Sequence, residues 1–102
     1  MEKHFTDYLD EIKSKIKEKD FDKAEELLLK CVELTEKESA KNKWGVAPGY
    51  YEKLGIIYRK QKNINKEIEI LERFDKQIKA PGAGPKKLKE RLMKLKNNVK
   101  LT

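Results

Sequence analysis

Apolar residues recur at intervals of three and four along almost the whole chain, and this spacing is the feature that most restricts how the chain can fold. Residues with that spacing lie on one face of an α-helix, whereas a half-buried strand needs strict alternation. Phe5, Tyr8, Leu9, Ile12 and Ile16 form the first such series, with charged residues between them. No segment alternates apolar and polar residues over the length of a strand. The sequence therefore predicts an all-α fold.

Gly- and Pro-rich breaks divide this pattern into five predicted helices. Asp20 or Asp22 can cap the second helix, and Asn63 can cap the fourth, because a short polar side chain accepts from the first free N–H groups of a helix. Pro48 and Pro85 suit the first turn of the third and fifth helices, where a missing N–H costs nothing. The predicted helices cover residues 5–19, 21–41, 48–62, 64–78 and 85–100.

The charge of the chain is concentrated at its C-terminal end. The formal net charge is +7. A chain of 102 residues is long enough for about one domain with a modest core. Residues 1–40 have a net charge of −4, residues 41–78 of +4 and residues 79–102 of +7, so the first 78 residues balance to zero. No apolar run approaches the roughly 20 residues of a membrane span, and the N-terminus lacks a signal-peptide core. We therefore expect a cytoplasmic protein without membrane contact.

The residues that most enzymes need are scarce in this chain. Cys31 is the single cysteine and His4 the single histidine, so neither a disulfide nor a set of three or four metal ligands is expected. Cys31 follows Leu27 and Leu28 on an apolar face, where a small buried residue is typical. The acidic residues alternate with lysines as on a solvated helix surface. We expect no catalytic site, no metal and no cofactor.

Residues 50–78 resemble a tetratricopeptide repeat, a helix–turn–helix unit of about 34 residues with the pattern W-x2-L-G-x2-Y near its start. Tyr51 stands in place of the Trp, and Leu54, Gly55 and Tyr58 follow at the spacing of the family. The family uses a glycine at this place so that the two helices can approach closely, and we expect the same of Gly55. Glu67 stands where a small residue would face that glycine.

Residues 5–38 resemble a degenerate copy of the same repeat. Its second helix matches the family at Phe21, Ala24, Leu28 and Cys31, whereas its first helix has Glu11-Ile12 and Lys15 at core positions. Tyr8 and Tyr51 are 43 residues apart, so about nine residues are inserted between the copies. The resemblance implies one domain with two stacked hairpins, an insertion at 39–49, a loop at 79–84 and a basic capping helix at 85–100.

The same resemblance implies a function in protein–protein interaction. The first helices of stacked repeats line a concave groove that binds a peptide or helix of a partner, so the expected role is that of an adaptor or regulatory subunit. Members that grip a C-terminal carboxylate have an Asn where this chain has Ile56, so we do not expect that clamp. The implied groove residues are Lys13, Ile16, Lys17, Glu52, Ile56, Arg59 and Lys60. These lysines can equally be an ordinary solvated surface.

Trp44, the single tryptophan, lies in the insertion. Buried, it would cover the seam between the hairpins, and exposed, it would anchor a partner.

The last helix supports an alternative function, the non-specific binding of nucleic acid. Its candidate phosphate contacts are Lys86, Lys87, Lys94 and Lys96. Arginine, which favours guanine contacts, is rare, so base-specific readout is not expected. In the simpler interpretation, Leu88, Leu92 and Leu95 cap the fold and the lysines are solvated. A third hypothesis is a homo-oligomer in which the acidic front of one copy meets the basic end of the next.

Overall fold

The computed structural model describes residues 8–43, 45–79 and 83–100, and it confirms the all-α prediction with five helices and no strand in those residues. Phe5 and Trp44 lie outside the described residues, so the predictions about them stay predictions. The helices are α1 (Leu9–Lys17), α2 (Phe21–Asn42), α3 (Pro48–Lys60), α4 (Ile64–Asp75) and α5 (Ala83–Lys100).

Several helix boundaries differ from the sequence prediction. Helices α1 and α3 each end two residues earlier than predicted, and α2 continues through residues 39–42, the first part of the segment assigned to the insertion. Helix α4 ends at Asp75 instead of Ile78, where the Lys79 Nζ donates to the Asp75 carbonyl at 2.6 Å and satisfies one of the last free carbonyls. Helix α5 begins two residues before Pro85. Proline is tolerated there because the first four N–H groups of a helix have no partner within it.

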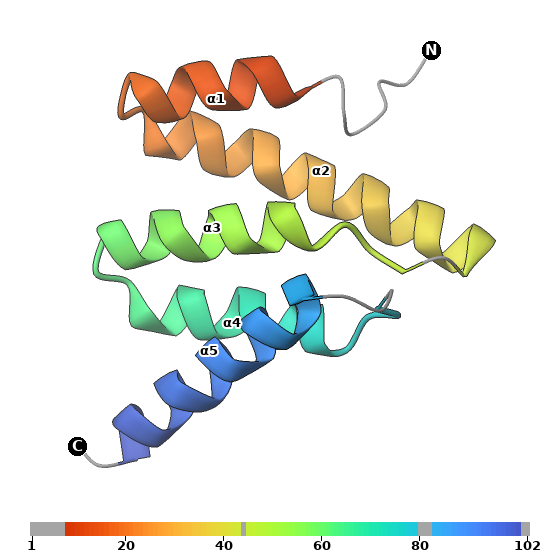
Figure 1. Ribbon diagram of the computed structural model, residues 1–102. Coiled ribbons are helices and arrows are strands. Elements are labelled where there is room, and N and C mark those ends of the chain that lie inside the picture. The colour runs from red at the N-terminus through yellow and green to blue at the C-terminus, as the bar shows by residue number, and fades with distance from the viewer. Residues whose placement is uncertain (1–7, 44, 80–82, 101–102) are drawn as a thin grey trace.

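Each helix packs on the next one along the chain, and α5 packs on both α4 and α3. Figure 1 shows α1 to α4 side by side in one row, with α5 crossing α4. The Cα extents of 48 × 34 × 19 Å agree with such a flat arrangement. Helix α1 packs on α2 alone within the described residues, whereas α3 has neighbours on both sides.

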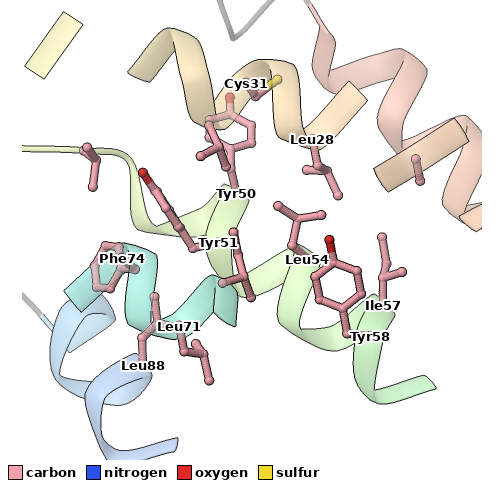
Figure 2. Close-up of a cluster of buried hydrophobic side chains, with 14 of the residues drawn as sticks. Leu28, Cys31, Tyr50, Tyr51, Leu54, Ile57, Tyr58, Leu71, Phe74 and Leu88 are labelled. Carbon is pink, nitrogen blue, oxygen red and sulfur yellow. The ribbon is translucent and has the colours of Figure 1, made fainter. Parts of the chain in front are cut away.

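One apolar core runs through the row. Tyr51, Leu54 and Ile57 of α3 are buried, Leu54 points toward Leu28 of α2 in Figure 2, and Tyr51 meets Phe74 of α4 with ring centroids 5.0 Å apart. Cys31 is fully buried, as predicted, and burial raises the pKa of its thiol to about 11. Leu88, Leu92 and Leu95 are also buried in this core, so the apolar face of α5 covers the end of the row.

The two hairpin turns repeat each other with an offset of 43 residues. Asp20 accepts from the Lys23 N–H at 3.3 Å, and Asn63 accepts from the Lys66 N–H at 3.1 Å. The N–H groups of the same two caps donate to the carbonyls five residues earlier, at 2.9 and 2.8 Å. The residues before the caps, Lys19 and Lys62, are both left-handed, with φ of 63° and 58°. The cap at Asn63 is thus confirmed, and Asp20 is the cap of α2.

The expected close approach at Gly55 is wrong. A Cβ placed on Gly55 would lie 3.9 Å from Cγ of Glu67, which is an ordinary van der Waals contact. The side chain of Glu67 occupies the space in front of the glycine, so the two helices do not approach so closely that only glycine fits. A tight approach occurs instead where α5 begins, since a Cβ on Gly84 would lie 3.2 Å from Pro48.

Candidate functional site

The most unusual polar residue of the described chain is Glu67, a carboxylate in the first turn of α4 that is 1% exposed. Its Oε2 accepts from Arg59 of α3, at 3.3 Å from Nε and 3.1 Å from Nη2. It also accepts from Arg91 of α5, whose Nε lies 3.0 Å from Oε2 and whose Nη2 lies 3.5 Å from Oε1. A buried carboxylate is tolerated only when it is paired in this way. Glu67 therefore links α4 to both neighbouring helices.

An open pocket of about 290 Å³ surrounds this ion cluster. Its apolar lining comes from Ile56, Leu71 and Leu88, and Ile56 is 40% exposed. The full lining is Glu52, Gly55, Ile56, Arg59, Glu67, Leu71, Lys87, Leu88 and Arg91. Helices α3, α4 and α5 each contribute part of it, so the pocket combines apolar side chains with three cations and two carboxylates.

The structure brings together only part of the predicted groove. Glu52, Ile56 and Arg59 all line the pocket. Lys60 lies elsewhere on α3, with its Nζ 6.0 Å from the centroid of the Phe21 ring. Lys13, Ile16 and Lys17 belong to α1, which does not pack on α3 within the described residues. The two sets of groove residues therefore do not form one continuous floor.

The four candidate phosphate contacts on α5 are all exposed, but they have different surroundings. Lys87 lines the pocket. Lys96 lies 3.8 Å from the carboxylate of Glu72, with both side chains more than two-fifths exposed. Lys86 and Lys94 form no salt bridge with the described residues. Only Lys87 is therefore placed to contribute to the pocket.

Glu67 and Arg91 line the pocket but were not among the predicted groove residues, and the sequence contained a signal for both. The chain has three arginines among many lysines, and all three bind a glutamate of another helix. A planar guanidinium suits a buried carboxylate better than a lysine does. Arg91 is the only arginine of α5, and Glu67 is a charged residue at a position where the repeat pattern has a small residue. Together these two departures could have indicated the cluster.

A second polar cluster joins α2 to α3 and α4. Glu36 accepts from the Tyr51 hydroxyl at 2.7 Å and from Arg73 at 2.8 and 2.9 Å. Two turns further along α3, the Tyr58 hydroxyl donates to Glu25 at 2.6 Å. Burial, reinforced by the hydrogen bond to the glutamate, raises the pKa of both phenols far above the ordinary value. These bonds hold three helices together.

A second pocket, of about 300 Å³, lies beside those bonds. Its cations are already used within the fold, since Lys66 lies 3.5 Å from Glu25 and Arg73 is bound to Glu36. Its lining also contains Glu69, so the pocket has no excess of positive charge. The pocket around Glu67 is therefore the better candidate for a binding site.

Other kinds of site find no support in the described residues. Nowhere in them do three His, Cys, Asp or Glu side chains gather in a way that could hold a metal ion. None of the helices, as far as they are described, combines the length and the apolar composition needed to cross a membrane.

Comparison with protein-family models, with curated proteins and with solved structures gives no match. The resemblance to tetratricopeptide repeats therefore rests on the motif residues of the sequence.

Proposed function

We propose that this protein is a protein–protein interaction module, an adaptor or regulatory subunit, that binds a peptide or helix of its partner in the pocket between α3, α4 and α5. The observation that carries the proposal is the exposure of Ile56, 40%, beside the buried Leu71 and Leu88. An apolar side chain from a partner would bury Ile56 and extend the core outwards. Three of the residues that the family resemblance implies as groove residues line this pocket.

The size of the pocket also favours a protein ligand. Pockets for small molecules have volumes of about 300–1,000 Å³, and this one, about 290 Å³, is at the lower limit. It suits one or two side chains of a partner. Interfaces commonly place such an anchor in an apolar centre with a polar rim, and Arg59, Lys87 and Arg91 would supply that rim.

Ile56→Asp tests the proposal. We expect the amount of each protein captured from the source cell to fall by about tenfold or more, because the substitution buries a charge at the centre of the interface. Quantitative affinity capture with mass spectrometry measures this. Met93→Asp is the matched control, because Met93 is 56% exposed on α5 and does not line the pocket. Identical sets of captured proteins for wild type and Ile56→Asp, with both chains folded, would exclude this pocket.

The alternative function, non-specific binding of nucleic acid, is supported by the exposure of Lys86, Lys87, Lys94 and Lys96 on one helix. Binding of a labelled DNA duplex at low and physiological salt would test it, because phosphate contacts weaken steeply with salt. Replacing the four lysines by Glu should abolish that binding if the alternative holds. Absence of duplex binding by the wild-type chain at low salt would remove it.

A further inference from the structure

We propose that the partner segment is an acidic amphipathic helix, in which an Asp or Glu lies one helical turn from the apolar side chain that enters the pocket. This inference rests on the proposed function and adds the chemistry of the ligand. Its basis is the pair of arginines that Glu67 holds at the rim, one from α3 and one from α5.

Glu67 fixes both guanidinium groups but does not use all their donors. It accepts only from Nε and Nη2 of Arg59 and of Arg91. Among the described residues, Nη1 of neither arginine has a hydrogen-bond partner. The two side chains remain 51% and 30% exposed, so these donors can reach a ligand. Because the arginines are already held in place, a partner carboxylate would meet donors that lose little freedom on binding.

The charge around the pocket favours an anionic partner. Its lining holds three cations, Arg59, Lys87 and Arg91, against the two carboxylates Glu67 and Glu52, so the balance is positive by one. Helix α5 adds further lysines and carries a single acid, Glu90. A partner with acidic residues would gain from this field, whereas a basic partner would be repelled. Glu52 is the only other acid of the lining, so its charge should weaken the binding of such a partner.

The walls of the pocket favour a helix over an extended strand. A strand binds by adding main-chain hydrogen bonds to the edge of a sheet, but α3 and α5 satisfy their own main-chain groups. A helix instead inserts side chains spaced by three and four residues into a groove. Side chains at those spacings are about 5–6 Å apart at Cβ, so an apolar anchor over Leu71 can have an acid directed to the arginines.

The test is a peptide-display selection on the full chain, with a library of helical 14-residue peptides randomised at their exposed positions. We expect the recovered peptides to be enriched in Asp or Glu three or four positions from a large apolar residue. Fluorescence anisotropy then measures the affinity of one labelled peptide for the variants. Arg59→Gln should weaken binding about tenfold, since a hydrogen bond to a charged group is lost while Arg91 still pairs Glu67.

Two matched variants sharpen the result. Glu52→Gln should strengthen binding about twofold, because it removes a like charge from the lining. Lys86→Gln removes a charge from the exposed face of α5 outside the pocket and should change the affinity by less than about twofold. Far-UV circular dichroism and urea unfolding confirm that each variant is folded.

The outcomes separate this inference from the proposed function. Peptides that depend on Ile56 but show no acidic enrichment would overturn the inference and leave the pocket as the binding site. Equal effects of Arg59→Gln and Lys86→Gln would also overturn it. If no peptide is recovered, or if those recovered bind Ile56→Asp as well as wild type, both proposals fail. Displacement of the peptide by a DNA duplex at physiological salt would make nucleic acid the occupant and overturn the inference.

Discussion

The two hairpins have the same turn, 43 residues apart, but equivalent positions in them have different surroundings. Tyr58 is 4% exposed in the second hairpin, and its counterpart in the first is Lys15, which pairs with Glu18 at the surface. Leu54 is fully buried, and its counterpart Glu11 is exposed. The same backbone turn thus supports a first helix with buried apolar residues at these two positions in one hairpin and with charged residues there in the other.

The position of each hairpin in the row explains this difference. Helix α1 is at the end of the row and packs on α2 alone within the described residues, whereas α3 packs on α2, α4 and α5. With a single described neighbour, α1 has fewer positions to bury than α3, so charged residues such as Lys15 and Glu11 cost little there. The charged residues at apolar motif positions of the first hairpin therefore belong to the helix that has fewer described neighbours.

In the second helices of the hairpins, it is the second hairpin that carries the charged residue. Ala24 is fully buried in the first hairpin, and its counterpart in the second is Glu67, which is almost fully buried as well. The small residue of the first hairpin is replaced by a carboxylate that must be paired, and the pairing brings two arginines to one pocket. At this position of the first hairpin, alanine is sufficient for packing. In the second hairpin the charge of Glu67 draws two arginines to the pocket, so the candidate binding site lies there.

The largest expected effect comes from removing both partners of Glu67. The double substitution Arg59→Met and Arg91→Met leaves a buried carboxylate unpaired and should lower the free energy of unfolding by about 3–5 kcal/mol. Urea unfolding of purified variants measures this. Adding Glu67→Leu should recover most of the loss, because apolar groups often replace a buried ion cluster at no cost.

The matched control for this prediction lies in the first hairpin. Lys13→Met and Lys17→Met remove two exposed cations from α1 and should change the stability by less than about 0.5 kcal/mol. A triple variant as unstable as the double one would show that the buried charge is not the cause. The contrast between the two hairpins would then need another explanation.

A smaller effect concerns two phenols of α3, of which Tyr58 has Lys15 as its counterpart in the first hairpin. The folded state holds the pKa of Tyr51 and Tyr58 above the value of about 10 in the unfolded chain. Their contribution to stability is therefore complete below pH 10 and decreases as the unfolded state loses its phenolic protons. Above that pH, the free energy of unfolding should fall by about 1.4 kcal/mol per pH unit for each tyrosine.

Tyr58→Phe provides the check on this pH dependence. It removes the hydrogen bond to Glu25 and should cost about 1.5–3 kcal/mol at neutral pH, while Lys66 still pairs with that carboxylate. Urea unfolding between about pH 9 and pH 11 should then show a slope reduced by the share of one tyrosine. An unchanged slope would mean that Tyr58 does not titrate differently in the two states.

The sequence predicted the five helices well because each has a regular apolar face and a recognisable break. Capping follows from local chemistry, which is why the cap at Asn63 could be located without a structure and that of α2 could be narrowed to Asp20 or Asp22. The end of α4 was predicted too late, because Ile78 continues the apolar spacing although it is 45% exposed. Spacing alone does not show whether a side chain finds a neighbour to pack on.

The candidate site was only partly predictable for a related reason. Glu52, Ile56 and Arg59 were expected on one face of one helix, and they do line one pocket. Arg91 reaches the same pocket from α5, and its place depends on how α5 crosses α3 and α4, which no local pattern determines. The lysines of α1 were assigned to the same groove because the family stacks its first helices, but α1 and α3 do not pack on each other in the described residues.

The smallest effect tests the packing inside the second hairpin. Gly55→Ala should raise the free energy of unfolding by about 0.5–1 kcal/mol, because alanine is the better helix former and its methyl group would meet only the Cγ of Glu67. Gly49→Ala, at a helical glycine with no atom within 4 Å of the added methyl, is the control for propensity without contact. Urea unfolding of both variants separates the two contributions. A loss of more than about 1 kcal/mol at Gly55 alone would mean that the helices approach as closely as the family pattern implies, and that Glu67 cannot move aside for the added methyl group.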